Sequence, residues 1–511
     1  MADEALLSLQ NGSDIRGVAT DGIIGESVTL TQDKVAKLGR GFVLWLKGWF
    51  KPAPLRPRLR VAIGMDARLT GPEFAETLKR AITEAGADAL CCGLATTPAM
   101  LFSTLHDGLD VDGAIMLTGS HLSFNKNGMK FFRDGSEVDK SQLTEIIGLA
   151  SDGVVDGNVE HGEVHIFNLL SEYSHSLREK IKADLRGVAD DEERPLIGLR
   201  IVVDAGNGSG GFFAKRVLEP LGADTTGSQF LTPDGRFPNH VPNPEDYEAM
   251  RSVSTAVVMS NADMGIIFDS DVDRVAIVDD EGRAINRNEF VAMAAAITLE
   301  EHPGTSIVTD SITSTGLTEF VEGVLGGHQC RYQRGYRNVI GEAIRKDEAG
   351  KPTWLAVETS GHAAFKENHF CDDGAYFATK VIIRLTKLKH EGKKLFSLIE
   401  RLPVPQESNE YRLTILESDF SRAAIRALDG LRQYVAQISG WEEVNQNHDG
   451  LRVMCNDEKE SGWFLFRLSL HSPVMVLNVE SDVLGGSREI VDKLKMFFRN
   501  VRSIDSSSLY K

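Results

Sequence analysis

The chain has 511 residues, of which 42% are hydrophobic and 25% charged, the composition of a folded protein rather than a disordered or fibrous one. Its 74 acidic and 56 basic residues give a formal net charge of −18, which argues against a surface that neutralises the phosphates of nucleic acids or membranes. This length exceeds what one hydrophobic core usually serves, so we expect several domains.

The N-terminal residues and the cysteines bear on where the chain works. The first ten residues, MADEALLSLQ, contain neither a basic-then-apolar signal peptide nor an Arg-rich transit segment. The apolar stretch 42–50 is too short to span a membrane. Only two of the five cysteines, Cys91 and Cys92, cluster, which favours neither a disulfide framework nor a zinc site. We expect a reducing compartment, the cytoplasm or an organelle stroma, and leave open a transit peptide removed from the precursor.

Three stretches, 60–88, 200–224 and 306–327, share one plan. In each, an apolar β-branched run leads to an aspartate, then a small-residue turn and a helical pattern; the aspartates are Asp66, Asp204 and Asp310. Strand, turn and helix in this order predict βαβ units in three similar α/β domains. The tail from residue 411 has no such copy and reads as a smaller α+β domain. We place the domains at 1–192, 193–300, 301–405 and 406–511.

Within the first domain, residues 114–130 (AIMLTGSHLSFNKNGMK) carry a candidate nucleophile. An apolar strand opens into a polar turn that presents Ser120 and His121, and we expect the serine to be exposed there. Taken alone, Ser120 could be only a turn or N-cap residue. The following Lys130 lies at a distance that lets its cation return to the serine, as a phosphoserine or an incoming phosphate would require.

Within the second domain, residues 264–278 (MGIIFDSDVDRVAIV) place three carboxylates at alternate positions between two apolar strands: Asp269, Asp271 and Asp273. These hard oxygen ligands suit Mg²⁺. An EF-hand is disfavoured because the sixth position, which needs glycine, is Arg274. A solvated acidic turn is the plain alternative. A haloacid-dehalogenase-type phosphatase is the sharper one, although that family expects Thr or Val where Asp273 stands.

Two later segments combine groups that suit a sugar phosphate. Residues 354–374 place Glu358, Ser360 and His362 on a glycine-containing loop, where a carboxylate can accept two hydrogen bonds from sugar hydroxyls. Residues 467–473 (RLSLHSP) place Arg467, Ser469 and His471 at alternate positions, and three donors on one face suggest a phosphate site. Each of these residues, taken singly, could be ordinary surface polarity.

These four segments, in this order, resemble the α-D-phosphohexomutase family, whose members interconvert sugar 1- and 6-phosphates. The resemblance spans nearly the whole chain. It includes DIRG at 14–17, GPEF at 71–74, AGNGSGG at 205–211 and DGRFPNH at 234–240. It implies an α/β protein of four domains around a central cleft, each of which donates one loop.

The resemblance also implies roles for individual residues. Ser120 is similar to the phosphorylated serine, and Asp269, Asp271 and Asp273, together with Ser120, to the magnesium ligands. Arg16, Lys130 and His121 look like partners of the phosphate and of the transferred proton, and which of the last two is the base stays open. The remaining matches are substrate contacts: Arg274, Arg337 in RGYRNV (334–339), the sugar-selecting Glu358, Ser360 and His362, and the distal phosphate clamp of Arg467, Ser469 and His471.

Some positions depart from the family pattern. Leu122 and Ser123 stand where relatives usually have Asn-Pro, and Ser270 and Val272 replace the usual small spacers of the metal loop. In the clamp, Leu468 and Leu470 stand where Pro and Gly are common, and His471 and Ser472 replace Thr and Glu. These differences are compatible with an altered substrate or a lost activity.

The expected function is that of an isomerase which interconverts hexose 1-phosphate and hexose 6-phosphate through a phosphoserine and a hexose 1,6-bisphosphate. The ETSGH loop (358–362) favours the glucose/mannose type. A phosphoglucosamine mutase and a catalytically weak sensor of hexose phosphates stay as alternatives. We expect a monomer or homodimer whose partners are small sugar phosphates, not nucleic acid or membrane.

Overall fold

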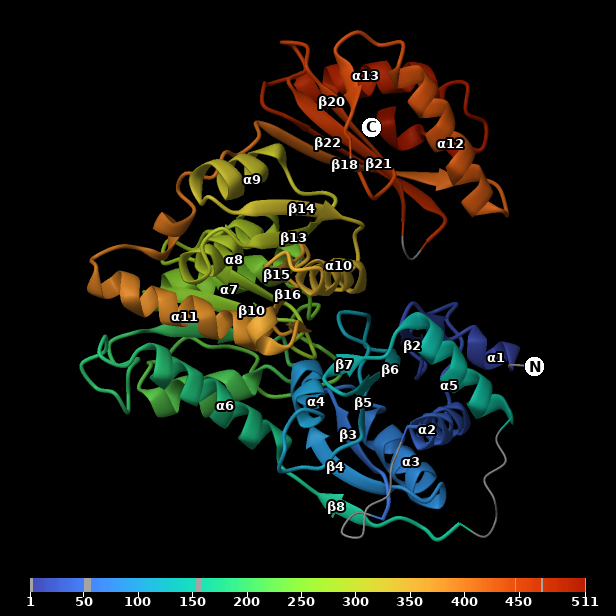
Figure 1. Cartoon of the computed structure of the whole chain (residues 1–511), viewed down its shortest axis with the longest axis vertical. Helices are drawn as coiled ribbons and strands as arrows, with labels where there is room; N and C mark the ends of the chain where they lie inside the picture. Colours follow the sequence, from blue (N-terminus) through green and yellow to red (C-terminus); the bar gives the residue numbers. More distant parts are fainter. Residues whose placement is uncertain (1–2, 50–56, 153–158, 446, 470–471, 511) are drawn as a thin grey trace. The chain divides into compact units, whose positions relative to one another are not determined.

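The computed structural model describes residues 3–49, 57–152, 159–445, 447–469 and 472–510 (Figure 1). The chain forms two compact units. Unit 1 comprises Met1–Asn286 and Ser360–Ser397, and unit 2 comprises Arg287–Thr359 and Leu398–Lys511. Both units are therefore built from two separate stretches of the chain.

The N-terminal part of unit 1 is a mixed sheet with helices on both faces. Its strands are β1 (Gln10–Asn11), β2 (Asp14–Val18), β3 (Arg60–Met65), β4 (Asp88–Leu94), β5 (Gly113–Leu117), β6 (Lys126–Arg133), β7 (Ser136–Glu137) and β8 (Val164–Ile166). Its helices are α1 (Glu4–Leu7), α2 (Gln32–Lys47), α3 (Gly71–Glu84), α4 (Thr97–Ser103), α5 (Lys140–Asp152) and α6 (Leu169–Asp184). The strand order is β1-β2-β6-β5-β3-β4-β8, with β7 paired to β6.

The first predicted repeat supplies the centre of this sheet. The apolar run 60–65 forms β3, which pairs in parallel with β4 and β5. Helix α3 follows, with a proline in its first turn, where the missing N–H costs nothing. Helices α2, α3 and α5 lie together in Figure 1, and their apolar side chains form one buried core with the sheet, including Phe42, Leu78, Ile115 and Ile146.

The second repeat forms a smaller sheet in unit 1. Its strands are β9 (Ile201–Asp204), β10 (Met264–Phe268), β11 (Val275–Val278) and β12 (Ala284–Ile285), in the order β12-β11-β10-β9. The helical segments are the π-helical η1 (Phe213–Leu218), the 3₁₀ turn η2 (Glu219–Leu221) and α7 (Tyr247–Ser260). The second stretch of unit 1, Ser360–Ser397, contains elements outside this four-stranded sheet: β16 (Ala363–Phe365), η4 (Lys366–Asn368), β17 (Cys371–Asp372), α11 (Gly374–His390) and the start of η5 (Leu395–Leu398). Strands β10 and β11 form an antiparallel hairpin, and residues 269–274 connect them.

The third repeat belongs to unit 2. Its elements are α8 (Arg287–Glu301), β13 (Ser306–Asp310), α9 (Thr315–Thr318), the π-helical η3 (Glu319–Val324), β14 (His328–Tyr332), α10 (Tyr336–Glu348) and β15 (Thr353–Val357). Strand β13 pairs in parallel with β14 on one side and β15 on the other. The loops after the carboxyl ends of β13 and β15 therefore meet at one edge, where ligands of parallel sheets usually bind.

The C-terminal part of unit 2 is an antiparallel sheet with helices on one face. Its elements are β18 (Glu407–Ile415), α12 (Phe420–Val435), β19 (Trp441–Glu443), β20 (Leu451–Cys455), β21 (Gly462–Leu468), β22 (Val474–Ser481), α13 (Gly486–Phe498), β23 (Ile504–Asp505) and η6 (Ser507–Tyr510). The strand order is β19-β20-β21-β22-β18-β23. Side chains of α12 and α13 form a buried core with the sheet, including Leu431, Phe464, Ile490 and Phe498.

The predicted fold class is confirmed: three α/β repeats precede an α+β domain. The aspartate of each repeat stands at the carboxyl end of a strand, directly after β3 or as the last residue of β9 and β13. The predicted domain boundaries and the central cleft stay predictions. Among the residues that the structure describes, no helix is both long and apolar enough to cross a membrane.

Candidate active site

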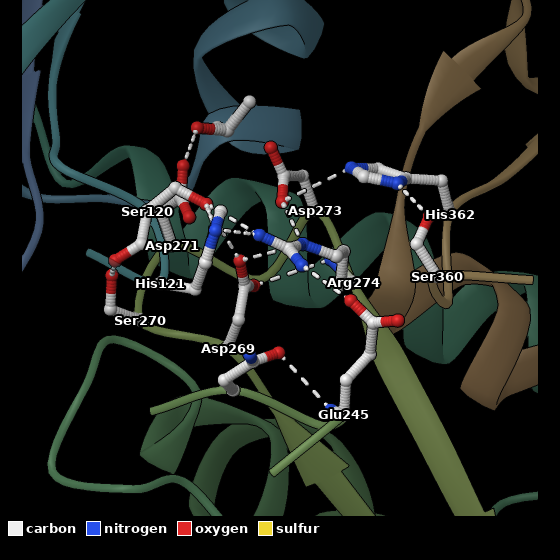
Figure 2. A network of polar contacts seen from close by, with 12 residues as sticks. Ser120, His121, Glu245, Asp269, Ser270, Asp271, Asp273, Arg274, Ser360 and His362 are labelled. Atoms are coloured by element: carbon white, nitrogen blue, oxygen red, sulfur yellow. Dashed lines mark hydrogen bonds and ion pairs between the residues drawn. The ribbon is translucent and has the colours of Figure 1, made fainter. Parts of the chain in front are cut away.

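Ser120 lies on a tight turn that follows β5. Its backbone is left-handed, with φ of 48°, a conformation that costs most residues about 1 kcal/mol or more. The Ser120 N–H donates to Thr118 Oγ1 at 2.8 Å, which closes the turn. Contrary to the expected exposure, the residue is only 6% exposed. The residues that cover it belong to the second repeat, as Figure 2 shows.

The Ser120 hydroxyl is surrounded by groups suited to phosphate chemistry. It donates to Asp269 Oδ2 at 3.1 Å and accepts from Arg274 Nη2 at 3.2 Å. His121 Nδ1 lies 3.2 Å from the same oxygen. A nucleophile, a carboxylate, a guanidinium and an imidazole thus converge on one atom (Figure 2).

The three predicted metal-loop carboxylates form one cluster between β10 and β11. Asp269, Asp271 and Asp273 are all buried, and each offers an oxygen within 4.8 Å of the others. Among the residues that the structure describes, none forms a hydrogen bond with Oδ1 of Asp271 or Oδ1 of Asp273. Buried carboxylate oxygens without donors are costly unless a cation completes them. The donor set therefore fits a divalent cation that prefers oxygen ligands.

Mutual repulsion and burial perturb this cluster. Burial, followed by the charge of Asp273, raises the pKa of Asp271 to about 6. Burial and the two neighbouring carboxylates also raise the pKa of Asp269. For Asp273, burial opposes ionisation, but Lys130, His362 and Arg274 outweigh it and lower its pKa. The cluster gathers more negative charge than its resident cations offset, which again favours a bound cation.

Arg274 is the central cation of the site. It is 4% exposed, and its Nε lies 3.6 Å from Asp269 Oδ2. Its Nη1 lies 3.7 Å from the carboxylate of Glu245, and its Nη2 also contacts His121 Nδ1. Arg274, followed by burial, lowers the pKa of His121 to about 2. His121 is therefore a neutral imidazole here, and the same shift makes it a weak base.

Lys130 and Arg16 reach the site from the adjacent antiparallel strands β6 and β2. Lys130 Nζ lies 3.5 Å from Asp273 Oδ2, and 3.6 Å from the carboxylates of Asp14 and Glu137. Arg16 Nη2 bonds Asp14 at 2.8 Å, and Nη1 donates to the carbonyl of Thr118. Lys130 therefore lies beside the metal loop, and its predicted approach to Ser120 stays a prediction.

The loop predicted to select the sugar is divided between the two units. Ser360 and His362 belong to unit 1, where Ser360 Oγ and His362 Nδ1 lie 2.9 Å apart and His362 Nε2 is 3.9 Å from Asp273 Oδ1. Glu358 belongs to unit 2, is 3% exposed and accepts the N–H of Gly335 at 2.7 Å. His362 thus contacts the metal loop, a link that the sequence pattern did not indicate.

In unit 2, the predicted clamp residue Arg467 lies near the end of the antiparallel strand β21. Arg467 is 5% exposed, and its Nε lies 3.9 Å from Asp449 Oδ2. The same carboxylate oxygen accepts the hydroxyl of Ser311 at 2.6 Å and the N–H of Arg334 at 3.4 Å. Burial, and then Arg334, lowers the pKa of Arg467, whereas Asp449, Asp310 and Glu410 oppose the shift.

The remaining predicted contacts are less closely tied to this cluster. Ser469 is half-buried, and its hydroxyl oxygen accepts from Ser472 at 3.1 Å. Arg337 is half-buried on α10, with its guanidinium carbon 5.9 Å from the ring of Tyr336. His471 lies outside the described residues. The roles assigned to all site residues stay predictions.

Sequence reasoning missed several residues that shape the two clusters. They are Asp14 and Glu137 beside Lys130, Asp449 beside Arg467, Thr97 donating to Asp271 Oδ2 at 2.5 Å, and Arg68 beneath the Ser120 turn. For Arg68, the sequence offers one local indication: it stands two residues after Asp66, the aspartate at the end of the first repeat's strand.

Three tandem α/β domains followed by a C-terminal sheet domain are the fold class of the α-D-phosphohexomutases. Family models described as phosphoglucomutase/phosphomannomutase α/β/α domains I, II and III match residues 10–153, 171–282 and 286–404. The phosphomannomutase/phosphoglucomutase of Pseudomonas aeruginosa is 30% identical over 98% of this chain and 96% of that protein. The chain belongs to the phosphoglucomutase/phosphomannomutase family.

Solved structures share the fold. A phosphoglucomutase/phosphomannomutase family protein from Burkholderia thailandensis is 27% identical, with a TM-score of 0.76 over 98% of both chains. The N-acetylphosphoglucosamine mutase of Aspergillus fumigatus, at 14% identity, shows likeness of fold alone. Its complex with GlcNAc-6P and magnesium has a TM-score of 0.52, covering 86% of this chain and 83% of that one. Its complex with glucose 1,6-bisphosphate has a TM-score of 0.55 and covers 97% of both.

Proposed function

We propose that this protein is a phosphohexomutase of the glucose/mannose type, an isomerase that interconverts hexose 1-phosphate and hexose 6-phosphate. The observation that carries the proposal is the buried Ser120 hydroxyl, 3.1 Å from an aspartate of a three-carboxylate cluster and 3.2 Å from a guanidinium. A phosphoserine at this position would face both the cation site and Arg274. Family membership and the names of the relatives support the same activity.

We propose Mg²⁺ as the cation. Asp269, Asp271 and Asp273, with an oxygen of phosphorylated Ser120, would hold it, because four oxygen donors and added water suit its coordination. Bound there, the ion would neutralise charge on the transferred phosphoryl group. The charge of the ion would also offset the repulsion among the three buried carboxylates.

In the proposed cycle, phospho-Ser120 gives its phosphoryl group to a free hydroxyl of the bound hexose monophosphate. The phosphorus–oxygen bond to Ser120 breaks as the bond to the sugar oxygen forms, and the product is a hexose 1,6-bisphosphate. After this intermediate reorients, the Ser120 hydroxyl takes the other phosphoryl group. Such transfers depend mainly on positioning and charge neutralisation, which we assign to Arg274, Arg16 and Lys130.

The proton that leaves the attacking hydroxyl needs an acceptor. Nδ1 of His121 lies 3.2 Å from Ser120 Oγ, a suitable distance for the step that rephosphorylates Ser120, but its lowered pKa makes it a weak base. Lys130 Nζ lies 3.5 Å from Asp273 Oδ2, and both residues stay candidates for the base. General base catalysis typically contributes about 10² to 10⁴ in rate.

In this proposal, residues of unit 2 select the sugar and bind the distal phosphate. Glu358 would accept hydrogen bonds from sugar hydroxyls, while Ser360 and His362 of unit 1 contribute beside the metal loop. Arg467, Ser469 and His471, with Arg337, would hold the phosphate that is not reacting. We further propose action as a monomer or homodimer in a reducing compartment, cytoplasm or organelle stroma, on small sugar phosphates.

The test combines activity with the mass of the intact protein. Glucose, mannose and glucosamine 1-phosphates are compared with catalytic hexose 1,6-bisphosphate and Mg²⁺, and formation of each 6-phosphate is followed. The purified parent should carry one phosphate on a fraction of molecules, and Ser120→Ala should lose the phosphate and nearly all turnover. Ser103→Ala, a buried serine whose hydroxyl bonds only Met100 within α4, should retain both. Turnover of Ser120→Ala within tenfold of the parent, or net release of inorganic phosphate by the parent, would refute the proposal.

A further inference from the structure

A buried arginine beneath the Ser120 turn is not used by the chemistry described so far. Arg68 stands two residues after the strand-end Asp66 and is 1% exposed. Its Nη2 donates to the carbonyls of Ser120 and Leu122 at 2.5 and 2.6 Å. Its Nη1 donates to the carbonyls of Ser123 and Lys126 at 2.7 and 2.6 Å. One side chain therefore binds four backbone carbonyls of a single loop.

The loop that Arg68 binds has two backbone hydrogen bonds of its own, from the N–H of Leu122 to the carbonyl of Gly119 and from the N–H of Lys126 to the carbonyl of Ser123, both 3.0 Å. Residues 119–126, GSHLSFNK, contain no proline to restrict the backbone, and Ser120 has the left-handed φ of 48°. Four carbonyls that converge on one buried point need donors, because an unsatisfied buried carbonyl costs about 1–3 kcal/mol. The planar guanidinium offers five N–H donors in a fixed fork, whereas a lysine ammonium offers only three.

The charge of Arg68 is itself balanced. Arg68 Nε lies 3.3 Å from Asp66 Oδ2, and neither side chain is exposed to solvent. Such a buried pair is tolerated only when the remaining donors are hydrogen-bonded, and here the loop carbonyls meet that need. The pairing fixes the guanidinium at the end of β3, on the rigid part of the sheet.

The same assembly reaches the metal loop. Ser270 Oγ is within hydrogen-bond distance of Asp66 Oδ2, at 3.0 Å, and of the Ser120 carbonyl, at 2.8 Å. The Ser120 carbonyl therefore accepts a hydrogen bond from Arg68 and lies within hydrogen-bond distance of Ser270, whose single hydroxyl proton goes either to that carbonyl or to Asp66. The guanidinium of Arg68 is tightly packed. A Cβ at Gly119 would lie 2.5 Å from Arg68 Cζ, and the ring of Phe237 lies 5.2 Å from the same carbon.

We propose that Arg68 is a positioning residue, which holds the loop of Ser120 in the geometry that phosphoryl transfer needs while Ser120 alternates between its free and phosphorylated forms. The inference rests on the proposed mutase function. Arg68 touches neither the Ser120 hydroxyl nor the carboxylates of the metal loop; it acts through the backbone. A displacement of about 1 Å at a reacting group can cost roughly 10²-fold in rate.

The test compares Arg68→Lys with Arg60→Lys. Arg60 is a half-buried arginine of β3 whose guanidinium donates to the carbonyl of Leu109, away from the site. For Arg68→Lys we expect kcat to fall roughly 10²-fold while KM stays within threefold, because no residue of the distal phosphate site changes. Hydrogen exchange of the amides of residues 119–126 should become faster than in the parent. Arg60→Lys should leave kcat and this exchange unchanged.

Equal kcat values of Arg68→Lys and Arg60→Lys, or a lower kcat with unchanged exchange in the loop, would overturn the inference. If Arg68→Lys does not fold, Ser270→Ala removes the hydroxyl that lies within hydrogen-bond distance of the Ser120 carbonyl and of Asp66 Oδ2, the carboxylate oxygen paired with Arg68. It should lower kcat by roughly tenfold or less, with KM unchanged and faster exchange; no change in kcat and exchange overturns the inference in the same way. Absence of mutase activity in the parent refutes the proposed function itself, so the two failures are distinguishable.

Discussion

The two charged clusters of the molecule differ in which buried group lacks a hydrogen-bond partner. In unit 1, among the residues that the structure describes, one oxygen each of Asp271 and Asp273 has no donor. In unit 2, within the same described part of the chain, Arg467 Nε has no hydrogen-bond partner. Burial and then Arg334 lower the pKa of Arg467, whereas Asp449, Asp310 and Glu410 oppose the shift.

This difference indicates which ion each cluster can bind. Buried charge is expensive unless it is paired, so a site that keeps unpaired carboxylates is completed by a cation. A site that keeps an under-paired guanidinium is completed by an anion. One protein with both sites suits a reaction in which a metal-assisted phosphoryl transfer occurs while a second phosphate is held.

The largest effect is expected from removing the cation of unit 1. Treatment with a chelator should lower turnover at least roughly 10³-fold, because several kcal/mol of charge stabilisation is lost, and Mg²⁺ should restore it. Mg²⁺ should also raise the thermal unfolding midpoint of the parent. The Asp271→Asn, Asp273→Asn double variant should show neither response, whereas Asp280→Asn, in the turn between β11 and β12, should show both. Full activity of the double variant in metal-free buffer would contradict a metal site.

The next largest effect concerns the anion site of unit 2. Arg467→Ala removes a charge-assisted contact worth about 1.5–3 kcal/mol, so KM for the hexose phosphate should rise roughly 10- to 150-fold. Activity should depend more on added hexose 1,6-bisphosphate, because an escaping intermediate leaves Ser120 without its phosphate. Saturation curves with and without bisphosphate measure both. The exposed Arg412→Ala is the matched control; identical curves for the two variants would remove the clamp from the mechanism.

A third prediction concerns stability of the C-terminal sheet. Burial raises the pKa of Glu480 to about 7, although Arg452, Ser408 and Trp463 oppose the shift. Between its ordinary pKa and about 7, the folded protein binds more protons at this site than the unfolded chain, so stability falls as pH rises through this range. The contribution is at most about 3 kcal/mol.

This third prediction is tested with Glu480→Gln. From pH 5 to pH 8, its thermal unfolding midpoint should rise relative to that of the parent, because the variant has no carboxyl to ionise. The exposed Glu458→Gln should follow the parent at every pH. Parallel midpoints for Glu480→Gln and the parent would show that Glu480 does not titrate in this range.

The smallest effect tests whether Asp449 competes with phosphate. Asp449→Asn keeps an acceptor for Ser311 and for the N–H of Arg334 but removes the charge that faces Arg467. We expect KM to fall by about fivefold, a change of about 1 kcal/mol, because the buried Arg467 loses a competing carboxylate, and inorganic phosphate to inhibit more strongly. A higher KM would mean that the carboxylate orients Arg467 instead. Asp457→Asn, on the exposed turn after β20, is the control.

Much of the architecture could be predicted because it is encoded locally. The runs 60–65, 201–204 and 306–310 are strands that lead to an aspartate, as their β-branched and apolar residues indicated. The three alternate carboxylates fall on one hairpin loop, so sequence spacing alone was enough to group Asp269, Asp271 and Asp273. Their closeness to Ser120 followed from the family resemblance rather than from the spacing.

What could not be predicted depends on contacts between distant segments. Lys130 meets Asp14 because β6 and β2 pair, and Ser120 is buried because residues 149 positions later cover it. Arg68 looked like an ordinary polar residue after a strand, since nothing local shows that four carbonyls converge on it. Ser360 and His362 lie two to four residues from Glu358 yet belong to the other compact unit.

The discontinuity of the units has a consequence for how the chain is made. Residues 287–359 leave the ribosome before residues 360–397, which unit 1 needs for α11, Ser360 and His362. At the usual rate of about 5–20 residues per second, α11 is synthesised several seconds after the first 286 residues, so unit 1 cannot be completed before then. A truncation between 287 and 397 therefore removes part of the unit that precedes it, and an expression clone of the serine-bearing unit must include the distant stretch or splice it in.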